Sequence, residues 1–228
     1  MTVHYHGLPL TPGKNLQYME GKNLCVSYAT RSKQQVEFAM KHGQSVMWDN
    51  GAFSAHTKGK PLDVPAFYEW VGSKIGHPHW AVVPDVIGGD VQAQRKLTAT
   101  WPFPAEYGAP VWHLHLPLDY LLEIADRWPR ICFGSSAQFW KIGTPEWQAR
   151  MDEAFNYLAR HRTFLPWVHG MRMLSKIGDR WPLASADSVN VARNYNTKRI
   201  PECPGCMANR IDRVQGEVRW PTTGYIFS

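Results

Sequence analysis

Short β-type runs alternate with amphipathic helical segments along most of the chain, and this alternation constrains the fold more than any other feature. The runs are 24–28, 45–48, 80–83, 110–116, 130–133, 164–168 and 183–186. Apolar residues at helical spacing predict helices over 33–42, 65–75, 119–128 and 145–160, and a short one over 207–214. Strands that alternate with helices predict a parallel sheet, because each crossover helix returns the chain to the end where the previous strand began.

The predicted helices begin at recognisable capping residues. Ser32 and Asp63 precede two of them, and Thr144 precedes another that has Pro145 in its first turn. Seven or eight strand–helix units in 228 residues predict an α/β fold, a compact (β/α)8 TIM-like barrel, as one domain over residues 1–228. We expect an irregular C-terminal tail from about residue 199. A Rossmann-like sheet is the alternative, but no Gly-x-Gly-x-x-Gly follows an early strand.

Composition excludes several classes of protein. Apolar residues make up 44% of the chain and charged residues 19%, which is typical of a globular protein rather than a disordered one. No stretch approaches the ~20 apolar residues of a membrane helix, and the first residues do not resemble a signal peptide, so we expect a cytoplasmic protein. Four Cys do not form a disulfide framework in a chain of this length, and reduced thiols are expected.

Polar residues follow most of the predicted strands. In a barrel the chemistry lies at the carboxyl ends of the strands, so these residues are the candidates for a site. A single Asp there is commonly a helix cap, but three Asp after three different strands favour a shared site. His113 and His115 lie on the same face of their strand, which points either into the barrel or towards the helices. The candidates are Asp49, Phe53, Asp85, His113, His115, Gly134, Ser135, His169, Gly170, Asp187, Asn190, Arg193 and Asn194.

Two of these segments resemble motifs of the tRNA-guanine transglycosylases. Asp49-Asn50-Gly51-Ala52-Phe53 resembles the Asp-Ser-Gly-Gly-Phe motif of that family. The stretch from Asp187 to Asn194 is similar to the one that carries the family's nucleophilic Asp and a following Thr-Arg-Asn-Ala-Arg segment. Asp85 falls where the family has an Asp that reads the base, and His169-Gly170 resembles the end of its Met-Gly-Val-Gly strand. The resemblance covers roughly residues 24–194.

The resemblance implies exchange of a nucleic-acid base through a covalent glycosyl-enzyme intermediate. Asp187 would be the nucleophile, and Asp49 would protonate the departing guanine and later deprotonate the incoming base. Asp85 would accept hydrogen bonds from the N1–H and 2-amino groups of the base. The positions of the other candidates at strand ends suggest roles for them in substrate binding. The base pocket would include Phe53, His113, His115, Gly134, Ser135, His169 and Gly170, and Asn190, Arg193 and Asn194 would hold ribose or phosphate.

The chain also departs from that family. The transglycosylases that act on tRNA are longer and carry a Cys-x-Cys-x-x-Cys plus His zinc site, whereas only Cys203 and Cys206 are present here. We therefore expect neither a metal nor another cofactor, and the resemblance fits better the compact DpdA-type enzymes of phages and bacteria. Those enzymes replace guanine in DNA with a 7-deazaguanine of the preQ0 type. For a phage-encoded chain the compartment would be the host cytoplasm.

Several alternatives remain at this point. The net charge of +6 fits a polyanionic partner, and we prefer DNA to tRNA as that partner. The same Asp pair would serve a hydrolase of N-glycosidic bonds, and a non-catalytic nucleic-acid-binding barrel would keep only the basic surface. The sequence does not fix the oligomeric state, and a homodimer is one option.

Overall fold

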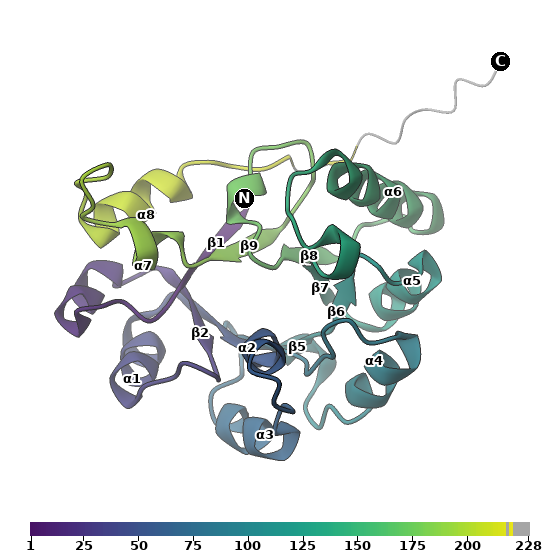
Figure 1. Cartoon of the computed structure of the whole chain (residues 1–228), viewed down its shortest axis with the longest axis horizontal. Coiled ribbons are helices and arrows are strands. Elements are labelled where there is room, and N and C mark those ends of the chain that lie inside the picture. The colour runs from purple at the N-terminus through teal and green to yellow at the C-terminus, as the bar shows by residue number, and fades with distance from the viewer. Residues whose placement is uncertain (218, 221–228) are drawn as a thin grey trace.

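In the computed structural model, which describes residues 1–217, 219 and 220, parallel strands form a sheet that closes into a barrel (Figure 1). The sheet order is β5-β4-β3-β2-β1-β9-β8-β7-β6. Its two outermost strands, β5 and β6, are separated only by Pro110, so the chain itself joins the two ends of the sheet. The predicted TIM-like α/β barrel is therefore confirmed. The strands are β1 (Val3–Gly7), β2 (Asn23–Ser27), β3 (Ser45–Asp49), β4 (Trp80–Val82), β5 (Gly108–Ala109), β6 (Val111–His113), β7 (Arg130–Gly134), β8 (Trp167–Gly170) and β9 (Ser185–Ser188).

Helices surround the barrel on all sides in Figure 1. Ser32, Asp63 and Thr144 each accept the backbone N–H three residues further along, so the predicted caps are confirmed. The helices are η1 (Gly13–Met19), α1 (Lys33–His42), α2 (Ala52–Thr57), α3 (Val64–Gly72), α4 (Val91–Thr98), η2 (Ala105–Tyr107), α5 (Leu118–Arg127), η3 (Ala137–Phe139), α6 (Pro145–His161), η4 (Leu174–Lys176), α7 (Asn190–Asn194) and α8 (Pro204–Asp212). The expected irregular tail from residue 199 therefore includes one helix, α8, and its part at 218 and 221–228 lies outside the described residues.

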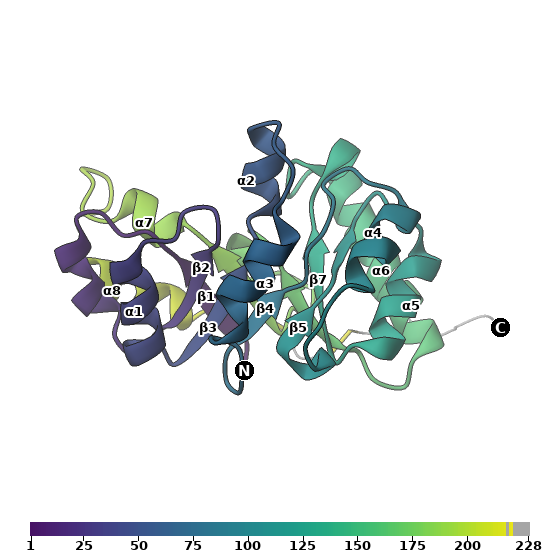
Figure 2. The same ribbon diagram turned by 90° about the horizontal axis from the view of Figure 1, so that it is seen from below.

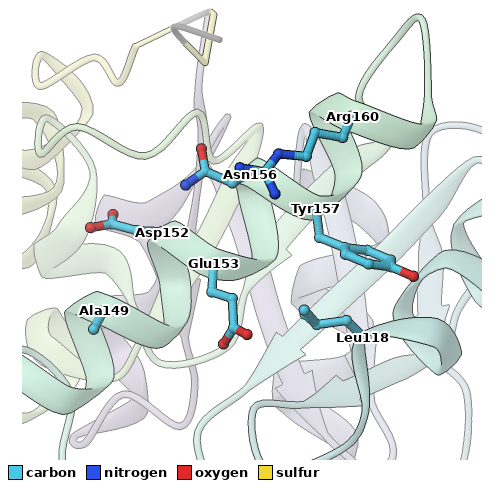
Figure 3. A pocket seen from close by; sticks show the side chains of 7 residues that line it. All are labelled: Leu118, Ala149, Asp152, Glu153, Asn156, Tyr157 and Arg160. Carbon is cyan, nitrogen blue, oxygen red and sulfur yellow. The ribbon is translucent and has the colours of Figure 1, made fainter. Parts of the chain in front are cut away.

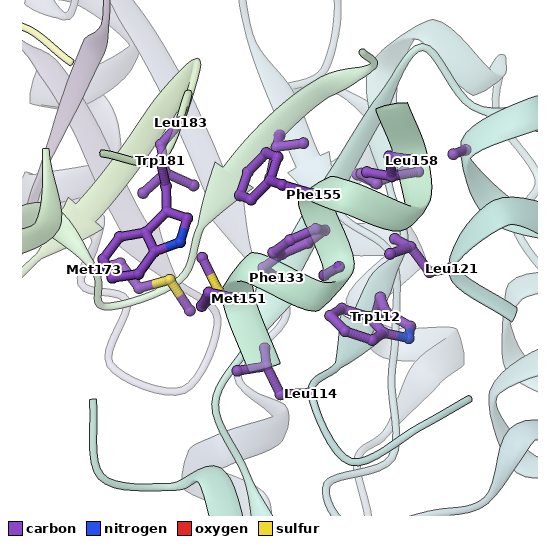
Figure 4. Packing of buried hydrophobic residues seen from close by; sticks show 14 of the residues in the cluster. Trp112, Leu114, Leu121, Phe133, Met151, Phe155, Leu158, Met173, Trp181 and Leu183 are labelled. Carbon is purple, nitrogen blue, oxygen red and sulfur yellow. The ribbon is translucent and has the colours of Figure 1, made fainter. Parts of the chain in front are cut away.

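Apolar side chains between the sheet and the helices form the core of the outer layer. Figure 4 shows how Met151, Phe155 and Leu158 of α6 pack onto Trp112 and Phe133 of the sheet. All five are fully buried. Burial of a side chain of this size stabilises the fold by ~1.5–3 kcal/mol, and truncation of one to Ala costs ~3–5 kcal/mol because a cavity remains.

The interior of the barrel is closed near the amino ends of its strands. The indole N–H of Trp80 donates to the hydroxyl oxygen of Tyr5 at 2.8 Å, and that hydroxyl lies 2.9 Å from the hydroxyl of Ser45. The guanidinium of Arg130 covers the Trp80 ring at 4.6 Å and lies 5.3 Å from the Trp167 ring. These contacts fill the floor of the barrel, so the polar residues above them face the carboxyl end.

Several strand predictions need correction, and the run predicted over 110–116 is a strand only over Val111–His113. The N-terminal strand β1 was not predicted, although Val3-His4-Tyr5-His6 alternates apolar and polar residues. His4 and His6 lie on its outer face and contact Asp212 of α8. The run predicted over 164–168 begins only at Trp167, since Pro166 lacks an amide hydrogen and Phe164 is 80% exposed. Strand β9 lies two residues later than predicted, so Asp187 is inside a strand.

Two of the four cysteines do not have the predicted reduced state. Cys203 caps α8 and forms a disulfide with Cys206 one turn later, where the Cα atoms are 5.1 Å apart. Cys25 and Cys132 are free, as expected, and both are buried. None of the helices in the described part of the chain is long and apolar enough to cross a membrane.

Candidate active site at the carboxyl end of the barrel

Three carboxyl groups from different parts of the sheet meet at the carboxyl end of the barrel. Asp49 is the last residue of β3, Asp187 is the third residue of β9, and Asp85 follows β4. The charges of Asp187 and Asp85 both raise the pKa of Asp49, which places the three groups within electrostatic reach of one another. The expectation that strand ends bring these residues together is thus confirmed for the three Asp.

Asp49 is held in a largely desolvated position. Burial is the main cause that raises its pKa to about 6, and the charges of Asp187 and Asp85 act in the same direction. Hydrogen bonds from Ser27 and from the backbone N–H of Gly51 act against this rise. Gly51 adopts a left-handed conformation with φ 80°, and a Cβ there would lie 3.0 Å from the Ala29 nitrogen. A side chain at position 51 would therefore disturb the turn that presents Asp49.

Asp187 has a different environment. The backbone N–H of Arg172 donates to Oδ1 of Asp187 at 2.8 Å, and Nε2 of His169 lies 3.2 Å from the same oxygen. Nδ1 of His169 lies 2.8 Å from the hydroxyl of Ser185, which also accepts the indole N–H of Trp167. An ionised carboxylate only accepts, so Nε2 of His169 donates to Asp187 when that group is ionised.

Asp85 is bound on both oxygens. The side-chain amide of Asn50 donates to Oδ1 at 2.8 Å and to the carbonyl of Val83 at 2.9 Å, while its oxygen accepts the backbone N–H of Ala52. Nε2 of His113 lies 2.8 Å from Oδ2 of Asp85. Asp85 and His113 are 7% and 2% exposed, so this contact is almost completely enclosed.

The two histidines that were predicted on one strand face take different positions. His113 is the last residue of β6 and points into the barrel, so the inward alternative holds for it. His115 lies beyond the strand and is only partly buried, with Nε2 3.1 Å from the carbonyl oxygen of Gly89. The hydroxyl of Ser136 connects the two rings, at 3.2 Å from Nδ1 of His113 and 3.1 Å from Nδ1 of His115.

Gly134 and Ser135, at the end of β7, support this arrangement from the side. A Cβ on Gly134 would lie 3.0 Å from Nδ1 of His113, so glycine leaves room for the imidazole ring. The hydroxyl of Ser135 accepts the indole N–H of Trp147 at 2.9 Å and therefore faces α6 rather than the three Asp. The serine that reaches the site is its neighbour Ser136.

An exposed rim surrounds the three carboxyl groups. Helix α2, which begins after β3, lies between β2 and β5 in Figure 1 and rises above the barrel in Figure 2. On α2, Phe53 is 49% exposed, and the guanidinium of Arg172 lies 4.5 Å from the centre of its ring. Arg172 also donates to the carbonyl of Ser135 at 2.9 Å and adopts a left-handed φ of 59°. Arg172 thus connects the segments that follow β3, β7 and β8.

Of the remaining predicted residues, His169 contacts Asp187 from below, whereas Gly170 and the α7 residues make no contact with the three carboxyl groups among the contacts of the described residues. His169 is fully buried below Asp187, and a Cβ on Gly170 would lie 2.9 Å from the Cβ of Met173 in the following turn. Asn190, Arg193 and Asn194 of α7 line a cavity of about 560 Å³ together with His4 and Arg210, on the outer side of β1. The structure therefore does not bring the α7 residues into contact with Asp49, Asp85 or Asp187 among the contacts of the described residues.

A further cavity of about 450 Å³ lies on the outer layer (Figure 3). Leu118 of α5 and residues of one face of α6, from Ala149 to Arg160, form its wall. Neither cavity is lined by Asp49, Asp85 or Asp187, so the candidate active site is defined by its side chains rather than by the size of a cavity.

The sequence interpretation missed three residues of the site. Asn50 orients Asp85, Ser136 connects the two histidines, and Arg172 binds both Asp187 and the rim. All three lie two to four residues after a predicted strand end, so strand position was the available signal. No group of three or more His, Cys, Asp or Glu that could hold a metal ion occurs among residues 1–217, 219 and 220.

Comparison with protein-family models, with curated proteins and with solved structures finds no match to this chain.

Proposed function

We propose that the protein is a base-exchange transglycosylase that replaces guanine in DNA with a 7-deazaguanine through a covalent glycosyl-Asp187 intermediate. One observation carries the proposal. Asp49 and Asp187 lie at the same end of the barrel, but burial raises the pKa of Asp49 to about 6, whereas Asp187 accepts hydrogen bonds that favour its charged form. The different environments suit Asp49 to the role of acid and Asp187 to the role of nucleophile.

The reaction consists of two displacements at C1′ of the sugar. In the first, a carboxylate oxygen of Asp187 bonds to C1′, the C1′–N9 bond breaks, and the proton of Asp49 goes to the departing guanine. In the second, Asp49 takes the N9 proton of the incoming base, N9 bonds to C1′, and the bond to Asp187 breaks. Both steps conserve the phosphodiester chain and need no other reactant.

Asp85 is suited to read the base. Its two oxygens accept from Asn50 and His113, and each carboxylate oxygen has a second lone pair for a further donor. The N1–H and the 2-amino group of a guanine-type base offer two such donors. A base without them would leave the buried carboxylate partly unsatisfied, which is the basis of strong discrimination.

The rim is suited to a nucleic acid whose target base is unstacked. Phe53 presents an exposed ring next to Arg172, and stacking on such a ring suits a flipped or single-stranded base. Lys58, Lys60 and Lys141 are exposed on segments that follow β3 and β7, on the same side as the three carboxyl groups. Their charges would neutralise phosphates.

The experiment is incubation of the protein with radiolabelled guanine or preQ0 and either a DNA duplex, single-stranded DNA or tRNA. The proposal predicts label in DNA for the wild type and none for Asp187→Asn. Label in tRNA alone would replace DNA with tRNA as the substrate. Free guanine released without incorporation would identify an N-glycoside hydrolase, and no reaction with any nucleic acid would leave a binding protein.

A further inference from the structure

A continuous chain of hydrogen bonds runs from Asp85 through His113, Ser136 and His115 to the carbonyl of Gly89. Its four contacts are 2.8, 3.2, 3.1 and 3.1 Å long. Three members, Asp85, His113 and Ser136, are at most 7% exposed, so protein groups rather than solvent satisfy them. The direction of each hydrogen bond can therefore be assigned from the donors and acceptors present.

Both ends of this chain only accept. The Gly89 carbonyl requires a proton on Nε2 of His115, and an ionised Asp85 requires a proton on Nε2 of His113. Between the rings, the hydroxyl of Ser136 has a single hydrogen and can donate to only one of the two Nδ1 atoms. The other Nδ1 must itself carry a proton in order to donate to the Ser136 oxygen.

If Asp85 is ionised and both imidazoles are neutral, the four groups hold one proton too few to form all four hydrogen bonds. One additional proton is therefore required. The position of that proton follows from the surroundings. Burial is the main cause that lowers the pKa of His115. The hydrogen bond to the Gly89 carbonyl acts against this, but the net direction is downward, which disfavours a cation at His115. His113, in contrast, directly faces the Asp85 carboxyl. Oδ1 of Asp85 is occupied by the Asn50 amide, which is consistent with an ionised carboxylate.

We propose that Asp85, His113, Ser136 and His115 form a relay that holds one excess proton as the imidazolium of His113, and that this cation keeps Asp85 ionised and positioned to accept a guanine-type base. The part of this proposal that concerns base binding rests on the proposed function, whereas the protonation state of His113 does not. His113 is accordingly a positioning residue that acts through Asp85. The Ser136 hydroxyl is essential to it, because it accepts from His113 while donating to His115.

The chain around His169 provides an internal comparison. There the Trp167 indole donates to Ser185, Ser185 donates to Nδ1 of His169, and Nε2–H donates to Asp187. Every contact is satisfied by a neutral imidazole. The same accounting that requires a charged ring at His113 thus requires none at His169, although each histidine faces a buried Asp.

The first test counts protons in the wild-type protein, without reference to activity. Nitrogen-15 NMR of labelled histidine at pH 7, assigned with His113→Gln and His115→Gln, reports which ring nitrogens carry hydrogen. The proposal predicts two protonated nitrogens in His113, and only Nε2 protonated in His115 and in His169. A single protonated nitrogen in His113 would overturn it, whatever the protein's activity.

The second test addresses the role of the relay in base binding. In Ser136→Ala the excess proton loses its acceptor, so we expect the KM for the free base to rise roughly tenfold at pH 8, as for loss of a hydrogen bond to a charged group. At pH 6 bulk protonation of His113 should reduce this rise, while kcat of the variant follows that of the wild type. His161→Gln, an exposed histidine on α6, is the matched control.

The comparison of variant with wild type at each pH removes the effect of the neighbouring groups. Asp49 titrates in this range and Asp187 also faces the site, but both are unchanged in Ser136→Ala. Tyr120 of α5 and Arg150 of α6, which lie near the relay, keep one charge state between pH 6 and 8. An equal rise in KM at both pH values, or a loss of kcat alone, would contradict the positioning role. If base exchange is absent altogether, the NMR result still decides the protonation state.

Discussion

Nε2 of His169 lies 3.2 Å from Oδ1 of Asp187, one layer deeper in the barrel than the carboxyl group that it contacts. His169 is fully buried, and the rings of Tyr5 and Trp80 lie edge-on to it at 5.8 and 5.2 Å. The imidazole therefore has no free path to a substrate. Its effect on any reaction passes through the orientation and charge of Asp187.

Substitution of His169 tests this relationship. His169→Phe keeps the ring volume and removes the hydrogen bond, so kcat for base exchange should fall roughly tenfold to a hundredfold while KM for the free base changes little. His169→Gln can still donate to Asp187 and should recover part of the loss. Steady-state kinetics of the two variants measure the split. Equal kcat in His169→Phe and wild type would remove His169 from the mechanism.

The raised pKa of Asp49 predicts the pH dependence of base release. In the proposed mechanism the protonated form of Asp49 is the acid, so the rate of guanine release should fall as the pH rises above about 6. Single-turnover release from DNA, followed by chromatography between pH 5 and 8, measures this dependence. In Asp49→Asn the slow residual rate should not vary over that range. A wild-type rate that rises through pH 6 would assign Asp49 to the base form instead.

The same pKa has a consequence for stability. The folded-state pKa of Asp49, about 6, exceeds its unfolded value of 3.8, so the folded protein binds the proton more tightly. This contribution to stability is present below pH 4 and is lost as the pH rises to 6. Asp49→Asn should therefore raise the free energy of unfolding by ~2 kcal/mol above pH 6 and by much less near pH 4. Urea unfolding at the two pH values measures the difference, and an equal effect at both would contradict the raised pKa.

The exposed ring of Phe53 predicts a stacking contribution to DNA binding. Phe53→Ala should weaken binding of single-stranded DNA by roughly tenfold, since stacking of one base contributes ~1–3 kcal/mol. Phe164 is the matched control, because it is 80% exposed but lies before β8, at the opposite end of the barrel. Fluorescence anisotropy of a labelled oligonucleotide compares Phe53→Ala with Phe164→Ala. Equal losses for both would place the DNA elsewhere.

The lysines of the segment that joins α2 to α3 predict the salt dependence of DNA binding. Replacing Lys58 and Lys60 with Gln should reduce the slope of log Kd against log salt concentration by about 1 per lysine. Lys41 and Lys96, exposed in the last turns of α1 and α4, lead back to the amino ends of the strands and serve as controls. A slope unchanged in the Lys58/Lys60 variant, or reduced in the control, would contradict the assigned face.

The barrel could be predicted because its strands and helices alternate and because the caps at Ser32, Asp63 and Thr144 mark helix starts. Strand β1 was not predicted although Val3-His4-Tyr5-His6 alternates apolar and polar residues as a strand does, because histidines occupy the face that packs against the outer layer. The two histidines acquire their place only through tertiary contacts with Asp212 of α8. The strand predicted over 164–168 began too early, because the local apolar character suggested a strand before Pro166.

The three Asp of the candidate site could be predicted from strand position alone, since parallel strands bring their carboxyl ends to one edge. Their different environments could not. The pKa of Asp49 depends on burial, the position of Asp187 depends on His169 and Arg172, and the orientation of Asp85 depends on Asn50. Such contacts arise between residues up to a hundred or more positions apart, and no local pattern encodes them.

The most direct test of the account is to trap the covalent intermediate. Wild-type protein, mixed with an oligonucleotide in the absence of added base and quenched rapidly in acid, should yield a protein–DNA adduct whose mass lacks one guanine. Peptide mapping should locate the adduct at Asp187, and Asp187→Asn should form none. Base exchange without any adduct, or an adduct on another residue, would contradict the assignment of Asp187 as the nucleophile.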